Sequence, residues 1–154
     1  MHDNLTAIAM LSGKGTQIGA RGIDVDHLLC TDGATTAPAS PQIKEFYRYA
    51  ISWKHGAIDL VWPDPREMAD LLNRPEIARM VRQDLVTEAD YVPGVSPANA
   101  ALFAYDTLPA VFARTYFVFT DAAEPKVVDM ATGYEEYDCL ADYLSAWLKA
   151  FRAG

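Results

Sequence analysis

The second half of the sequence contains three short segments with the composition of β-strands, and the expected fold follows largely from them. The segments span residues 101–105, 114–120 and 126–130, and Pro109 and a turn over residues 121–125 separate them. They are rich in apolar and aromatic residues, as is typical of strands. With spacers this short, the simplest connection is a meander, in which each strand pairs with the next. The sequence therefore predicts an antiparallel sheet in this half.

Helices are predicted before and after these strands. Three of the earlier helices are predicted to begin with proline. Proline suits the first helical position because the N–H that it lacks would have no acceptor within the helix there. These prolines are Pro41, Pro65 and Pro75. Ser40 and Asp64 precede two of them as N-caps, and the helix after Ser40 is expected to run to about residue 52. A buried strand over residues 57–62 and a closing helix over residues 140–151 complete the pattern.

Helices grouped before an antiparallel sheet, with a final helix that returns to it, indicate an α+β fold. The chain has 154 residues, 51% of them hydrophobic, which suffices for one core. We therefore expect a single α+β domain whose antiparallel sheet carries helices from the N-terminal half and a C-terminal helix. Residues 1–40, rich in glycine, threonine and alanine, are predicted to be a loop-rich N-terminal part. It would contain a short apolar element and a second element over residues 23–29.

The charge of the chain bears on its partners. It has 13 basic and 21 acidic residues, which gives a formal net charge of −8. Such a surface would repel phosphate backbones and anionic membranes, so nucleic acid and membranes are poor candidate partners. The same charge suits solubility, and it also suits rapid docking onto a basic protein.

The cysteines and the first residues bear on the compartment. Cys30 and Cys139 have neither the spacing of a metal knuckle nor that of a redox pair, so reduced thiols are expected. The apolar run over residues 5–11 is short for a secretory segment and far too short to span a bilayer. The expected location is the cytoplasm.

One segment suggests nucleotide chemistry. Gly13-Lys14-Gly15-Thr16 is similar to the end of the phosphate loop of nucleotide monophosphate kinases. Ile8 stands where the leading glycine of such a loop is required, so the backbone could not wrap the phosphates. The long helix that should follow the loop is interrupted by Arg21-Gly22. A glycine loop without a ligand is the favoured interpretation.

Three further residues could bind a metal ion. Asp24, Asp26 and His27 offer oxygen and imidazole ligands, but three ligands within four residues are hard to converge on one ion. Surface charge and loop capping are the favoured roles. The sequence also lacks a nucleophile elbow. We therefore predict no catalytic residue, no metal and no cofactor, and keep as an alternative a small nucleotide-binding or metal-dependent hydrolytic enzyme that uses these residues and Lys14.

Acidic and aromatic residues alternate in the segment from residue 121 to residue 142. Acidic groups set the orientation of a partner, and tyrosines bury area at little entropy cost, so the segment has the chemistry of a protein-binding surface. In the competing interpretation Tyr134 and Tyr137 pack under the last helix and the acids are only solvated. The residues predicted to contact a partner are Tyr134, Glu135, Glu136, Tyr137, Asp138 and Asp142.

The order of these features resembles a known family. The matching features are a proline-initiated helix with Phe46-Tyr47, a glycine and strand over 56–62, and the segments 101–106, 116–119, 124–128 and 140–148. This order resembles the SUKH superfamily, whose bacterial members are mostly immunity proteins that neutralise toxins. The resemblance covers about residues 40–150, and the expected SUKH-like core spans residues 41–151. Lys54-His55-Gly56 stands where the family usually has Asn-Gly-Gly.

The resemblance implies a function and a type of partner. It implies a compact α+β fold without a cofactor, which binds a cognate protein toxin and occludes the toxin's active site or substrate channel. Because the chain is acidic, the toxin surface is expected to be basic. The oligomeric state and the chemistry of the toxin stay open.

Overall fold

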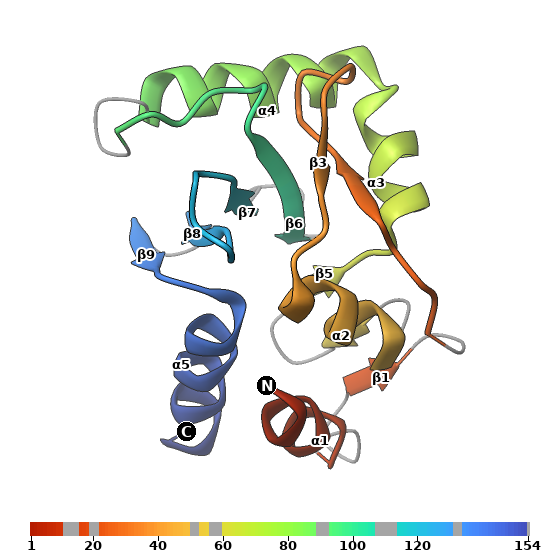
Figure 1. The fold of residues 1–154 in the computed structure, drawn as a ribbon, viewed down its shortest axis with the longest axis vertical. Helices are drawn as coiled ribbons and strands as arrows, with labels where there is room; N and C mark the ends of the chain where they lie inside the picture. Colours follow the sequence, from red (N-terminus) through yellow and green to blue (C-terminus); the bar gives the residue numbers. More distant parts are fainter. Residues whose placement is uncertain are drawn as a thin grey trace.

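A seven-stranded antiparallel sheet forms the centre of the computed structural model, with strand order β1-β4-β5-β6-β7-β8-β9 (Figure 1). A separate antiparallel pair contains β2 and β3. The strands are β1 (Thr16–Ile18), β2 (His27–Leu29), β3 (Thr36–Pro38), β4 (Trp53–His55), β5 (Leu60–Trp62), β6 (Ala100–Asp106), β7 (Arg114–Val118), β8 (Lys126–Asp129) and β9 (Glu135–Tyr137). The structure describes residues 1–10, 16–18, 22–49, 53–55, 60–88, 93–106, 114–130 and 134–153.

The C-terminal half of the sheet is the predicted meander. β6, β7 and β8 are consecutive antiparallel neighbours, so this prediction is confirmed. β9 extends the meander by one strand that the sequence did not predict. Of the strand predicted over residues 57–62, the structure describes only residues 60–62, as β5.

Helices account for most of the remaining structure. They are α1 (His2–Met10), α2 (Pro41–Tyr49), α3 (Pro65–Leu72), α4 (Pro75–Glu88) and α5 (Leu140–Ala153). The predicted prolines begin α2, α3 and α4. Ser40 Oγ accepts a hydrogen bond from the Ile43 N–H at 3.3 Å, as expected of an N-cap. The extension of α2 predicted to residue 52 lies outside the described residues. Within the described part of the chain, no helix is both long and apolar enough to cross a membrane.

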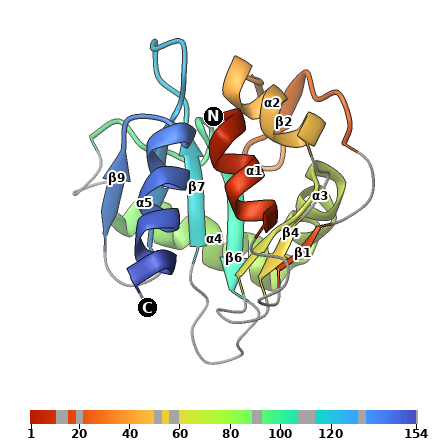
Figure 2. The ribbon, with the colours of Figure 1, turned by 90° about the horizontal axis from the view of Figure 1, so that it is seen from below.

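Helices cover both faces of the sheet, in agreement with the predicted α+β fold. In β6, Ala101 and Phe103 belong to the core cluster that includes residues of α1, α2 and α5, whereas Ala100 and Leu102 belong to the cluster with α3 and α4. This alternation follows from the two-residue period of a strand. Figure 2 shows α1 and α5 on one side of the sheet and α4 on the other. The molecule therefore has three layers.

An aromatic cluster fills the core under α2 and α5. The Phe103 ring lies 4.4 Å from the Phe117 ring, 5.2 Å from the Phe46 ring and 6.0 Å from the Tyr143 ring, measured between centroids. The Trp62 side chain is fully buried at 6.4 Å from Phe103. These rings come from α2, β5, β6, β7 and α5, so the cluster joins the helical layer to the sheet.

The N-terminal part is more ordered than the sequence indicated. The short apolar element is helix α1, and its Leu5 and Ile8 are buried in the main core. Asn4 Nδ2 donates hydrogen bonds to Ala141 C=O at 3.2 Å and to Ser145 Oγ at 2.8 Å, both in α5. The second element, expected over residues 23–29, is a strand only over β2. Before it, the Ile23 N–H donates to the Tyr47 carbonyl of α2 at 2.9 Å.

The N-cap of α3 provides a test of local stability. Asp64 Oδ1 accepts from the N–H groups of Arg66 at 2.6 Å and Glu67 at 3.1 Å, and Glu67 closes the capping box on the Asp64 N–H. We expect Asp64→Ala to lower the free energy of unfolding by about 1 kcal/mol, measured by urea denaturation. Asp70→Ala removes an exposed charge from the same helix and should change it by less than about 0.5 kcal/mol. Equal losses in the two variants would contradict the cap.

Candidate functional site

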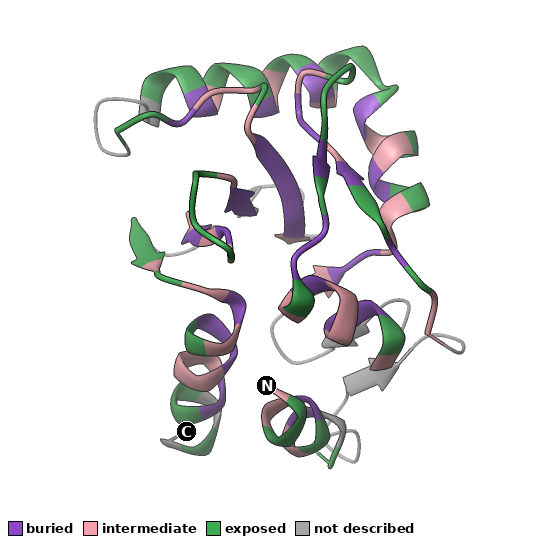
Figure 3. Ribbon diagram, viewed as in Figure 1, coloured by how far each residue is buried: buried purple, intermediate pink, exposed green. Residues whose placement is uncertain are grey.

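The residues predicted to bind a partner gather on β9 and at the start of α5. β9 is the last strand of the sheet, and it lies at the periphery of the molecule with mostly exposed residues (Figure 3). Asp142 lies in the first turn of α5. We call this set the β9 surface: Tyr134, Glu135, Glu136, Tyr137, Asp138 and Asp142.

Tyr137 anchors the β9 surface to the core. It pairs in register with Val127 and faces α5, where its ring lies 5.5 Å from the Tyr143 ring in edge-on geometry. Its hydroxyl donates a short hydrogen bond to Glu135, which lies on the same face of the strand. Desolvation, followed by the bond to Glu135, raises the pKa of Tyr137 above its ordinary value. Tyr137 therefore stays protonated and holds Glu135 in place.

Glu136 occupies the opposite face of β9. Its carboxylate forms an ion pair with Lys126 and accepts a hydrogen bond from the Tyr134 hydroxyl at 2.8 Å. These two contacts, that of Lys126 first, hold the pKa of Glu136 below its usual range, so the group is ionised at neutral pH. Tyr134 is 36% exposed. The competing interpretation, in which both tyrosines pack under α5, thus fits Tyr137 and is wrong for Tyr134.

Two acids of the predicted acidic segment have structural roles. Glu124 Oε1 accepts from the Gln42 N–H at 3.3 Å, at the N-terminus of α2. Asp129 accepts from the Thr115 hydroxyl at 3.4 Å, between neighbouring strands. Fewer acidic residues of the segment from residue 121 to residue 142 therefore belong to the solvent-exposed acidic surface than the sequence indicated.

The start of α5 is fixed from outside the helix. Gln42 Oε1 accepts from the Ala141 N–H at 2.8 Å, so a residue of α2 caps α5 across 99 positions of sequence. The Cys139 thiol lies 3.3 Å from Asp142 Oδ2 and donates to it. The sequence does not indicate the Gln42 contact. An N-cap is normally sought in the residue directly before the helix, and that residue is Cys139. The cap from Gln42 fixes the first turn of α5, and with it Asp142, relative to α2.

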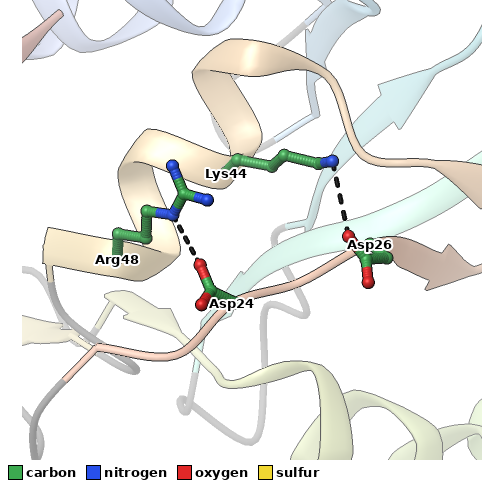
Figure 4. Close-up of polar contacts among 4 residues, drawn as sticks. All are labelled: Asp24, Asp26, Lys44 and Arg48. Atoms are coloured by element: carbon green, nitrogen blue, oxygen red, sulfur yellow. Dashed lines mark hydrogen bonds and ion pairs between the residues drawn. The ribbon is translucent and has the colours of Figure 1, made fainter.

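The residues of the enzyme alternative do not form a site among the described residues. Asp24 Oδ1 accepts from Arg48 Nε at 2.6 Å, and Asp26 Oδ1 lies 3.4 Å from Lys44 Nζ, so each carboxylate has its own cation on α2 (Figure 4). His27 is exposed at the start of β2. Lys14 lies outside the described residues. These contacts support the interpretation of Asp24 and Asp26 as surface charge.

No metal-binding group was found where the structure describes the chain: it holds no cluster of three or more His, Cys, Asp or Glu residues suited to an ion. Both cysteines are free thiols, as predicted. Burial, followed by the charge of Asp32, raises the pKa of Cys30 to about 11, which makes this thiol unreactive at neutral pH.

A hollow of about 470 Å³ lies between α1 and α2, and no sequence pattern predicted it. His2 Nδ1 lies 4.0 Å from a Glu45 carboxylate oxygen, and the His2 ring lies 5.8 Å from the Tyr49 ring. Pro41 and Arg48 complete the lining. The hollow is open and has opposite charges on its walls, so it does not select one sign of ligand charge.

No protein-family model matches the chain, and no curated protein or solved structure matches it either. The resemblance to the SUKH superfamily therefore stays a prediction, and the described contacts must carry the functional argument.

Proposed function

We propose that this protein is an immunity-type binding protein, which neutralises a cognate protein toxin by direct contact and occlusion of the toxin's active site. The contact would be made by the β9 surface. The observation that carries the proposal is the exposure of Glu135 and Glu136 on the last strand of the sheet, with the exposed Tyr134 directly before this strand. Tyr137, the last residue of the strand, packs against Tyr143 of α5.

The β9 surface is pre-organised for binding. Glu135 is held by the Tyr137 hydroxyl and Glu136 by Lys126 and Tyr134, so these side chains lose little conformational freedom on association. Pre-organised charge suits recognition of a basic surface, because complementary fields accelerate encounter and select the partner. Tyr134 can add buried aromatic area at the centre of the contact.

The enzyme alternative has less support. Asp24 and Asp26 each form an ion pair with a different cation of α2, Arg48 and Lys44, so the two carboxylates do not converge on one site. A thermal shift with nucleotides or divalent metal ions would favour this alternative, since binding to the native state raises stability.

The test uses the product of the neighbouring gene as the candidate toxin. Co-expression should restore growth, and the two proteins should co-purify. In the variant Glu135→Gln, Glu136→Gln, Asp138→Asn, shape is kept and three charges are lost. We expect its affinity to fall by about tenfold, mainly through a slower association rate, measured by surface plasmon resonance at low salt.

A matched variant separates this surface from net charge. Asp3→Asn, Asp70→Asn, Glu76→Gln removes the same charge from exposed positions of α1, α3 and α4. We expect its affinity to change by less than about twofold. Equal losses in the two variants would show that the β9 surface is not the contact, and absence of any complex with a toxic neighbour would contradict the proposed function.

A further inference from the structure

Among the strands that the structure describes, β9 forms an open edge of the sheet. It is the last strand in the sheet order, and β8 is the strand that pairs with it in the described part of the chain. Both ribbon views place it at the periphery (Figures 1 and 2). An open edge presents backbone N–H and C=O groups that can pair with another extended chain.

Hydrogen bonds elsewhere in the sheet determine which residue of β9 faces outward. The Met130 N–H donates to Arg114 C=O at 2.8 Å, so these two residues form a hydrogen-bonded pair. Such pairs alternate along an antiparallel ladder, so the next one joins Tyr116 to Val128, and the backbone of Val128 points toward β7. Glu136 lies opposite Val128. The N–H and C=O of Glu136 therefore point away from β8, into the open edge.

We propose that an extended basic segment of the partner protein adds an antiparallel strand to this edge and bonds both backbone groups of Glu136. This pairing mode rests on the proposed function and specifies how the partner engages the β9 surface. In an antiparallel ladder one residue exchanges both bonds with the residue opposite, and their side chains lie on the same face. A lysine or arginine of the partner would thus lie beside the Glu136 carboxylate.

Charge selects this occupant over a second copy of the chain. Symmetric pairing of two copies would place Glu136 opposite Glu136, and like charges directly opposite destabilise a ladder. A basic residue in that place is attracted instead. The Glu136 side chain is 29% exposed although Lys126 and Tyr134 contact it, and a carboxylate has about four acceptor positions, so it can accept another donor.

The edge is also short, which keeps it selective. β9 has three residues, so the backbone alone offers too few bonds to hold an arbitrary strand. Short, charged edges protect sheets from unspecific pairing. An edge with an acidic residue therefore disfavours pairing with neutral and acidic chains, and it can pair with a basic chain.

The probe for this edge is a synthetic peptide that alternates lysine and valine, added to the full-length ¹⁵N-labelled protein. We expect saturable chemical-shift changes centred on the Glu136 amide, with slower hydrogen exchange at that amide. A peptide with N-methyl groups on the pairing amides, and one with glutamate for lysine, should each bind about tenfold more weakly. Equal binding of the N-methylated peptide, or no saturable binding, would overturn strand pairing.

Protein variants test the same edge from the other side. Glu136→Pro removes the outward N–H together with the carboxylate, and leaves the β8–β9 bonds, which belong to Glu135 and Tyr137. Glu136→Gln keeps the backbone and removes the charge. Glu136→Gln should weaken peptide binding by about tenfold, and Glu136→Pro should weaken it by about a further tenfold, because it loses the backbone donor as well. Equal weakening in the two variants would contradict pairing through the backbone. If the spectrum of Glu136→Pro shows that it has not folded, the N-methylated peptide decides alone. Shifts at β9 that depend on protein concentration without peptide would identify a second copy as the occupant and overturn the proposal.

Binding experiments with the toxin distinguish failure of the strand-pairing proposal from failure of the proposed function. A toxin that binds the wild type and Glu136→Pro equally, but binds the three-charge variant weakly, would overturn strand pairing and leave the proposed function in place. Failure of the toxin to bind the wild type, with the peptide bound at β9, would contradict the proposed function and leave the edge as a strand-pairing site.

Discussion

Phe103→Ala is expected to lower the free energy of unfolding by about 3–5 kcal/mol, the cost of removing a large aromatic side chain from a close-packed core. Phe103 is fully buried, and the rings of Phe46, Phe117 and Tyr143 surround it. These three rings come from three different elements, α2, β7 and α5, so local repacking cannot fill the cavity without moving α2 or α5. Domains of this kind have a total stability of about 5–15 kcal/mol, so the loss would leave little reserve.

Urea denaturation followed by circular dichroism measures this effect. Val86 is the matched control because its apolar side chain is 67% exposed on α4. Val86→Ala should change the free energy of unfolding by less than about 0.5 kcal/mol. A loss below about 1 kcal/mol in Phe103→Ala would contradict the central place of this ring in the core.

Gly22→Ala is expected to destabilise the protein by about 3 kcal/mol through a steric clash. A Cβ at Gly22 would lie 1.9 Å from the Arg48 carbonyl oxygen and 2.6 Å from that of Tyr47. Both contacts are with the backbone of α2, which cannot rotate away as a side chain can. The Ile23 N–H donates to the same Tyr47 carbonyl at 2.9 Å, so moving the segment would break this bond.

Thermal unfolding measures the effect of the added methyl group, with an expected fall in Tm of about 6–12 °C. Gly94→Ala is the control, because Gly94 has φ +82° and nothing within 4 Å of its Cβ position. It should show only the conformational cost of a left-handed residue, about 1–2 kcal/mol. An equal or larger loss in Gly94→Ala would contradict the close approach at Gly22.

Local chemistry explains which elements could be predicted. Pro41, Pro65 and Pro75 mark helix starts whatever the rest of the chain does, and β6 to β8 have the composition of strands. β9 consists of Glu-Glu-Tyr, which has no strand signature, and it is extended because it pairs with β8. α1 is short, and burial of Leu5 and Ile8 supports it more than helix propensity does.

The candidate site was predicted in composition but not in detail. Glu135, Glu136 and Asp138 are consecutive or nearly so, so their grouping could be read directly from the sequence. The inward role of Glu124 could not, because its partner Gln42 is 82 positions away. The difference between Tyr134 and Tyr137 depends on contacts that the sequence does not show: Tyr137 packs against Tyr143 of α5, whereas the Tyr134 hydroxyl bonds to Glu136.

The bonds from Asn4 to α5 bear on how the chain acquires its structure. Asn4 and Ala141 are separated by 137 positions, and Gln42 and Ala141 by 99. The hydrogen bonds of α1 to α5 can therefore form only after the segment near residue 140 has reached α1, however fast α1 itself becomes helical. Pairings over such distances in sequence slow the search for the native state. We expect refolding to be slow for a chain of this length. The docking of α5 should be the step at which α1 and α2 take up their native positions.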